Sequence, residues 1–80
     1  MDEVIYYVVF HRGDWQIEHN GHYYGPHRDQ DTAVRLAVAA AELAKRDGEP
    51  AKVIVQEKNN TWHTEWEFAH DPHPAFAFAW

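Results

Sequence analysis

The chain of 80 residues contains no cysteine and no serine. Without cysteine it can form no disulfide, present no thiolate nucleophile and bind no zinc through sulfur. The absence of serine excludes every mechanism that uses a serine nucleophile. The three remaining aliphatic hydroxyls, on Thr32, Thr61 and Thr64, stand in no recognisable nucleophile motif. We therefore expect a protein that is not an enzyme and holds no cofactor.

Long hydrophobic runs and an excess of positive charge are also missing. No apolar stretch approaches the roughly 20 residues of a membrane-spanning helix, and the acidic opening residues do not resemble a signal peptide. The formal net charge is −6, and the seven Lys and Arg residues are spread along the chain. A dispersed set of cations disfavours nucleic acid as a partner. We expect a cytoplasmic protein that does not bind a membrane.

Apolar and aromatic residues are plentiful. The apolar share is 45% and the aromatic share is 15%, with four Trp, four Tyr and four Phe. That composition is typical of a folded domain, and 80 residues leave room for only one. We assign residues 1–74 to a single domain. Residues 75–80, which alternate Ala with Phe or Trp, form an apolar C-terminal tail.

The first third of the chain predicts three strands. Residues 4–11 are β-branched and aromatic, and residues 15–19 alternate apolar with polar side chains. Residues 22–24 begin a short third strand, which Gly25-Pro26 is expected to end.

Two tight turns would connect these strands. Asn20-Gly21 is a strong type I′ hairpin signal. A loop of Gly13-Asp14 would pair Phe10 with Ile17. The residues expected on the core face are then Tyr6, Val8, Phe10, Trp15, Ile17 and Tyr24.

A long helix is predicted over residues 30–47, which contain neither Gly nor Pro. Asp29 would cap its N-terminus, and Gly48 would stop it. Steps of about 100° per residue place one line of alanines along the helix. This line consists of Ala33, Ala37, Ala40 and Ala44, with Leu36 and Leu43 beside it.

Residues 51–58 and 61–68 predict a second hairpin around an Asn59-Asn60 turn. A two-residue loop would pair Lys52 with Glu67 on the face away from the core. The residues expected on the core face of this hairpin are Ala51, Val53, Val55, Trp62, Thr64, Trp66 and Phe68.

These elements predict an α+β fold in the order β-β-β-α-β-β. The sheet is expected to be antiparallel, with about five strands and one long helix packed on one face. With Trp15, Trp62 and Trp66 expected in the core and Glu residues on the other face, base stacking on the sheet is disfavoured.

Three segments carry a family resemblance: Val8-Val9-x-His11-x-Gly13-x-Trp15-x-Ile17, Asp29-x-x-x-Ala33-Val34-x-x-Ala37 and Leu43-Ala44-x-x-x-Gly48. In these residues the chain resembles a family of small bacterial domains, the domain of unknown function 2188. The likeness extends over roughly residues 6 to 74 and leaves the tail outside. It implies the same fold, but no catalytic or binding residues, because the family has no established activity.

Two clusters of polar residues are candidates for chemistry. His19 and His22 would stand opposite one another across the Asn20-Gly21 turn and could hold a metal ion together with His27, or with the pair His70 and His73. The alternative interpretation is that polar residues simply flank a turn. Similarly, His63, Glu65 and Glu67 are expected on one strand face, either as an acid–base or metal-binding trio or as a solvated surface.

One apolar group lies on the unexpected side of the predicted sheet. Ile5, Tyr7, Val9 and Tyr23 alternate with the core residues of their strands, where polar residues are the rule. Apolar, Tyr-rich patches are typical of protein interfaces. The tail residues Phe76, Phe78 and Trp80 would extend this surface.

The function that these residues favour is non-enzymatic: a self-associating module, most simply a homodimer, or a module that binds another protein. Two alternatives remain open: a nucleic-acid-binding or regulatory module, and a His-based metal-binding protein. The interpretation without a partner is a monomer that tolerates the exposed patch.

Overall fold

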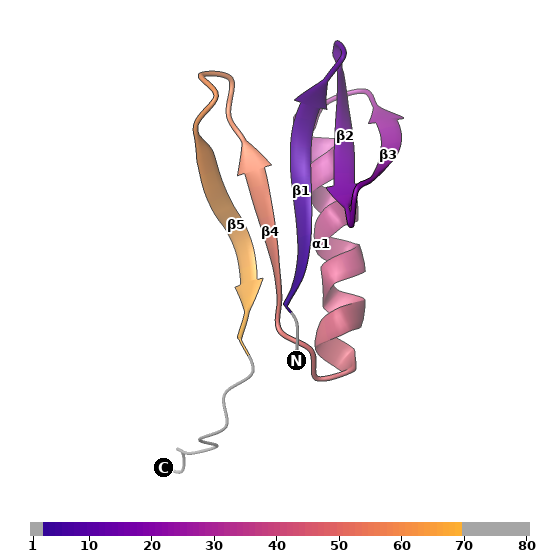
Figure 1. Cartoon of the computed structure of the whole chain (residues 1–80), viewed down its shortest axis with the longest axis vertical. Coiled ribbons are helices and arrows are strands. Elements are labelled where there is room, and N and C mark those ends of the chain that lie inside the picture. Colours follow the sequence, from indigo (N-terminus) through magenta and orange to yellow (C-terminus); the bar gives the residue numbers. More distant parts are fainter. Residues whose placement is uncertain (1–2, 70–80) are drawn as a thin grey trace.

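The computed structural model describes residues 3–69, which form five strands and one helix (Figure 1). The elements are β1 (Val4–His11), β2 (Asp14–His19), β3 (His22–His27), α1 (Gln30–Arg46), β4 (Ala51–Gln56) and β5 (Trp62–Phe68). This order confirms the predicted β-β-β-α-β-β arrangement. The tail predicted at residues 75–80 lies outside the described residues.

The strands form one sheet in the order β3-β2-β1-β4-β5, and α1 lies behind it in Figure 1. Three of the strand pairs are antiparallel, as expected, but β1 and β4 are parallel, so the sheet is mixed. The helix is the reason for the difference. It carries the chain back along the sheet, and β4 therefore starts at the same end as β1.

Helix α1 follows its local signals closely. Asp29 caps the N-terminus through its side chain, which accepts a hydrogen bond of 2.8 Å from the backbone N–H of Thr32. At the other end Gly48 adopts a positive φ of 78°, which ends the helix close to the predicted residue. Within residues 3–69, no helix combines the length and the apolar character needed to cross a bilayer.

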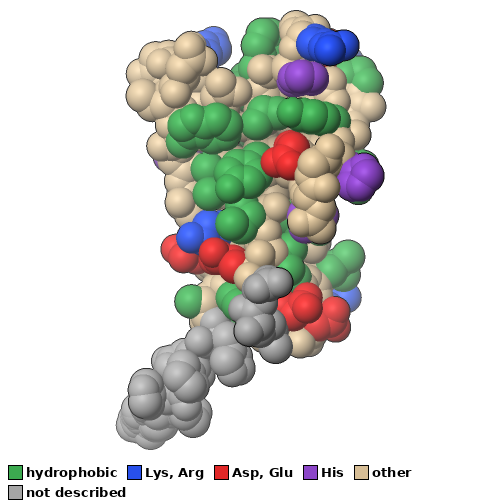
Figure 2. Space-filling view, in the orientation of Figure 1, with side chains coloured by type: hydrophobic (Ala, Val, Ile, Leu, Met, Phe, Trp, Pro, Cys, Tyr) green, Lys and Arg blue, Asp and Glu red, His purple; other side chains and the backbone are tan. Residues whose placement is uncertain are grey.

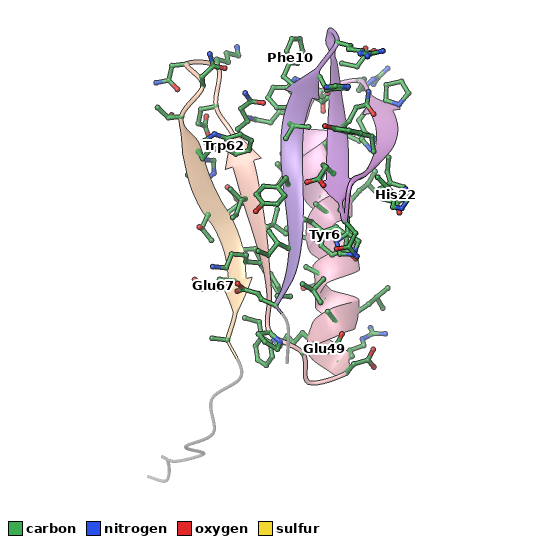
Figure 3. All side chains as sticks on the ribbon, in the orientation of Figure 1. Tyr6, Phe10, His22, Glu49, Trp62 and Glu67 are labelled. Carbon is green, nitrogen blue, oxygen red and sulfur yellow. The ribbon has the colours of Figure 1, made fainter. Side chains whose placement is uncertain are left out.

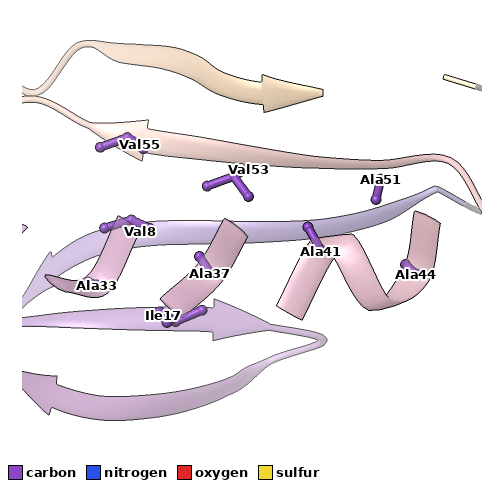
Figure 4. Packing of buried hydrophobic residues seen from close by; sticks show 9 residues of the cluster. All are labelled: Val8, Ile17, Ala33, Ala37, Ala41, Ala44, Ala51, Val53 and Val55. Atoms are coloured by element: carbon purple, nitrogen blue, oxygen red, sulfur yellow. The ribbon is translucent and has the colours of Figure 1, made fainter. Parts of the chain in front are cut away.

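The core lies between α1 and the middle of the sheet (Figure 4). Its largest fully buried side chains are the valines Val8, Val53 and Val55. The buried line of the helix is Ala33, Ala37, Ala41 and Ala44, so Ala41 takes the place that was predicted for the half-buried Ala40. Methyl side chains allow the helix axis to approach the sheet closely, but they bury little area, so the core is small.

The first hairpin has a different register from the predicted one. Its loop is Arg12-Gly13, with φ values of 54° and 87°, rather than Gly13-Asp14. Two successive positive φ values are the signature of a type I′ turn. Phe10 therefore pairs with Trp15, not with Ile17. A shift of two residues leaves every side chain on its predicted face.

Strand β3 continues through Gly25-Pro26 to His27, although the prediction ended it there. This strand forms one edge of the sheet, where the missing N–H of Pro26 breaks no pairing with a further strand. A register shift between Trp15 and Ile17 adjusts the pairing of β2 with this part of β3.

The second hairpin departs from its prediction at the loop. Lys58, Asn59 and Asn60 form a three-residue loop, closed by a hydrogen bond of 2.7 Å from the N–H of Glu57 to the carbonyl oxygen of Thr61. The additional loop residue moves the pairing by one position, so that Gln56 pairs with Trp62.

A bulge in the middle of β5 then restores the predicted register. Beyond it the observed pairs are those expected: Val53 with Trp66, Lys52 with Glu67 and Ala51 with Phe68. Between the loop and the bulge the faces are exchanged. Trp62 and Thr64, predicted on the core face, therefore lie on the opposite side of the sheet.

Candidate interaction surface

The side of the sheet opposite α1, here called the outer face, carries a group of apolar side chains. Val8 of β1 points into the core, so the odd-numbered residues of this central strand point outward. These include Ile5, Tyr7 and Val9, all half-buried. In β4, Ile54 pairs with Tyr7 and extends the group. Figure 2 shows hydrophobic side chains gathered across this face.

Two aromatic contacts extend this group toward the two edges of the sheet. Tyr7 meets Trp62 of β5 edge to face, with ring centroids 6.1 Å apart. On the other side Tyr23 of β3 stacks on His11 at 4.4 Å, with an angle of 11° between the planes. Tyr23 and Trp62 remain 49% and 50% exposed. The aromatic surface therefore reaches from β3 to β5, across the whole sheet.

The outer face carries a shallow depression rather than a deep cleft. A depression of about 290 Å³ lies over β1 and its neighbours. It is lined by Tyr7, Val9, Phe10, His11, Glu18, Tyr23, Gln56 and Trp62. A shallow, largely apolar surface suits the side chains of another protein better than it suits a small substrate, which binds in deeper concave sites.

Charged groups on the outer face are engaged within the chain. Lys52 lies 3.4 Å from a carboxylate oxygen of Glu3 and 3.7 Å from one of Glu67. Glu18, which pairs with Tyr7, accepts a hydrogen bond of 2.8 Å from the N–H of Gly21. Among the described residues, every cation beside the apolar group therefore has an acidic neighbour.

Four residues were predicted to share this surface, and they do: Ile5, Tyr7, Val9 and Tyr23 lie on one face. The other three, Phe76, Phe78 and Trp80, fall outside the described residues. Sequence reasoning missed two contributors, Ile54 and Trp62. Alternation with the buried Val53 and Val55 could have identified Ile54. Trp62 could not be found in this way, because its orientation depends on the loop and the bulge.

The proposed histidine metal site receives no support from the geometry. His19 and His22 pair across the turn as predicted, and His22 lies at the β3 edge (Figure 3). His19, however, stacks on Tyr6 at 4.3 Å, and its Nδ1–H donates to the carbonyl oxygen of Ile5 at 3.1 Å. Within residues 3–69, no three His, Asp or Glu side chains converge as metal ligands would.

A groove of about 360 Å³ separates α1 from β2 and β3 on the helix side of the sheet. Its lining is Tyr6, Ile17, His19, Tyr24, His27, Leu36 and Ala40. The Nε2 atom of His27 is buried without a hydrogen-bond partner. Leu36 and Leu43, expected beside the helix core, are 49% and 57% exposed.

The predicted acidic trio is only partly assembled. His63 lies 2.8 Å from Glu65 through Nε2, and its Nδ1 contacts Glu57. Glu67, the third predicted member, is on the other face with Lys52. The hydrogen bond to Glu65, together with the charges of both carboxylates, raises the pKa of His63. Both ring nitrogens face carboxylates on the surface, so the cluster is an exposed ion-pair network.

Comparison with curated proteins and with solved structures gave no match. A family model does match, over residues 6–68, and its description is an uncharacterized protein conserved in bacteria. This range begins in β1 and ends with the last residue of β5, so it contains nearly the whole of the described fold. The match confirms the resemblance found in the sequence: the chain belongs to the bacterial family DUF2188.

Proposed function

We propose that this chain is a non-enzymatic protein-binding module whose partner is a second copy of the same chain. The contact surface is the outer face. The observation that carries the proposal is the aromatic and aliphatic group of Tyr7, Val9, Tyr23 and Trp62 on the sheet face that no described helix covers. A sheet covered on one side normally presents polar residues on the other.

The composition of this surface favours association. Tyrosine and tryptophan are the residues that most often dominate the binding energy of protein interfaces. Tyr23 and Trp62 each leave about half of their surface in water. Burial of apolar area contributes about 25 cal/mol per Å², so covering both rings would provide a substantial part of the driving force.

A two-fold dimer fits the position of the surface. β1 is the central strand of the sheet, and the apolar group is centred on it. A two-fold axis near the middle of β1 would place the same residues of two chains against one another, as an isologous interface requires. Each chain has a formal charge of −6, so the two copies repel one another at low salt. Screening by salt should therefore strengthen the dimer, whereas salt weakens binding to nucleic acid.

The test is the solution mass of two variants in neighbouring positions of β3. Tyr23 and Tyr24 are 49% and 51% exposed, but they project from opposite faces of the strand. We expect light scattering to give a dimer for the unmodified chain and for Tyr24→Lys, and a monomer for Tyr23→Lys. Far-UV circular dichroism checks that both variants keep the fold.

Two results would contradict the proposal. One is a monomeric unmodified chain at every concentration and salt level measured. The other is an equal loss of the dimer in Tyr23→Lys and Tyr24→Lys, which would move the interface away from the outer face. Binding to a DNA or RNA pool that weakens with added salt would instead support the nucleic-acid alternative.

A further inference from the structure

Strand β5 forms an edge of the sheet, and no other strand among residues 3–69 pairs with its outer side. It runs for seven residues, Trp62–Phe68, without a proline, and most of its side chains are exposed. The other edge, β3, is interrupted by Gly25-Pro26. Strand β5 has a bulge at its middle, but residues 66–68 beyond it pair regularly with β4. An exposed edge is a template for strand addition unless something covers it.

Beside this edge, on the helix side, lies a groove of about 380 Å³. Its apolar floor is Val34 and Val38 of α1 and Trp66 of β5, each partly buried against the core. Figure 1 shows α1 behind β1 and β2, with β5 at the far side of the sheet. The helix packs mainly against β4 and β1, so the described residues cover only part of the side of β5 that faces the helix layer.

The sequence that follows β5 has the pattern of a strand. Residues 75–80 alternate alanine with an aromatic residue, and they follow the proline-containing segment His70-Asp71-Pro72-His73-Pro74. We propose that residues 75–80 add to the free edge of β5 of the same chain as a sixth, antiparallel strand. Their aromatic side chains would then cover the groove between α1 and β5.

The length of the connection sets the register of this strand. If residues 70–74 form a five-residue loop, Ala69 pairs with Ala75. Further along, Phe68 pairs with Phe76 and Trp66 with Phe78. Five residues lie within the usual range for a hairpin loop, and prolines are compatible with a loop because no ladder hydrogen bond is needed there.

This register places the aromatic residues on the required face. Phe68 and Trp66 are on the helix side, since they pair with the buried Ala51 and Val53. Lys45 of α1 lies 5.5 Å from the centre of the Phe68 ring, which agrees with that orientation. Paired residues of neighbouring strands share a face, so Phe76 and Phe78 would project toward the helix layer.

The charges around the groove are compatible with this occupant. Asp31 and Arg35 form an ion pair of 3.3 Å, and Glu42 and Glu65 complete the polar rim. Residues 75–80 carry no charged side chain, so their side chains bring no repulsion to this acidic rim. Attachment through a short loop also gives the tail a millimolar or higher effective concentration at its own β5 edge.

The absence of cysteine makes a direct test possible, because two introduced cysteines have no other partner within the chain. In Glu67→Cys/Ala77→Cys, the two residues would be directly opposed, with Cβ atoms about 5 Å apart. The control is Lys58→Cys/Ala77→Cys, whose first cysteine lies in the loop at the opposite end of β5. Oxidation in a glutathione buffer at low protein concentration, followed by mass spectrometry, measures the intramolecular disulfide in each.

For the opposed pair, we expect the effective concentration of the two thiols to exceed that of the control about tenfold or more. Two thiols joined by a flexible linker reach only millimolar effective concentrations, whereas paired strands hold the two side chains next to one another. Adding Phe78→Ser should lower the value toward that of the control, whereas adding Ala79→Ser should not. Equal values for the two cysteine pairs would overturn the proposal. Disulfide-linked dimers as the main product would also overturn it, because the strand would then come from a second copy. Neither result bears on the outer face, which Tyr23→Lys tests separately.

Discussion

Tyr7 and Trp62 contact one another edge to face on the outer side of the sheet, with their ring planes at 87°. Among the described residues, one belongs to the first strand and the other to the last. The contact links the two halves of the sheet across β4. It exists because the three-residue loop and the bulge of the second hairpin turn Trp62 away from the core side.

This contact should be measurable as a coupling between the two rings. Tyr7→Ala and Trp62→Ala are each expected to lower the free energy of unfolding, and the double variant should lose less than the sum of the two. Aromatic pairs contribute about 0.5–1.5 kcal/mol beyond the area that they bury. A double-mutant cycle measured by guanidinium unfolding gives the coupling directly. Strictly additive losses would show that the two rings do not support one another.

The close approach of α1 to the sheet predicts a strong asymmetry along one helix. Ala37 is fully buried, whereas Ala39 on the same helix is exposed. Ala37→Leu should therefore force the helix away from the valines beneath it and lower the free energy of unfolding by about 1–3 kcal/mol. Ala39→Leu should change it by less than about 0.5 kcal/mol. Thermal unfolding of both variants is the measurement, and comparable losses would contradict the packing described.

The ion-pair network of His63 predicts a dependence of stability on pH. Glu65, followed by Glu57, raises the pKa of His63 in the folded chain above its ordinary value of about 6.5. A raised folded-state pKa stabilises the fold most fully below the unfolded-state pKa, and this contribution is lost as the pH rises through the folded-state value. The stability advantage of the unmodified chain over His63→Gln should therefore be larger at pH 5.5 than at pH 8.

Unfolding curves at the two pH values measure that advantage, and the exposed His22→Gln serves as the control. An NMR titration of the imidazole should place the midpoint of His63 above that of an unstructured histidine. A stability difference that does not change between pH 5.5 and pH 8 would show that the two carboxylates do not stabilise the protonated imidazole of His63. A titration midpoint at or below that of an unstructured histidine would show the same.

Much of the fold follows from local patterns. The alternation in β1 identified both the buried Val8 and the outward Tyr7, and this survived an error in the turn because the register moved by two residues. The helix began beside its predicted cap, Asp29, since capping depends only on neighbouring residues. The predicted part of the candidate surface, Ile5, Tyr7, Val9 and Tyr23, consists of residues that alternate with core residues in this way.

The second hairpin marks where local patterns stop being sufficient. Its predicted register was correct from Val53 to Ala51 but wrong by one residue from Ile54 to the loop. A shift of one residue exchanges the two faces, so the predicted faces of β5 were wrong in this part. The loop length and the compensating bulge together allow the turn at Asn60, which has a positive φ of 67°, and the packing of Trp66 against the core. Neither the turn nor the packing of Trp66 alone identifies the position of the bulge in the sequence.

The sequence by itself determined the order and type of the elements, the caps of α1 and the face on which most strand residues lie. These properties depend on residues a few positions apart, whose backbone preferences and alternation are local. Only the tertiary structure decided that β4 runs parallel to β1, that Trp62 joins Tyr7, and that Leu36 stays exposed. Each of these depends on where a distant element lies, and that position is set by packing of the whole core rather than by any one segment.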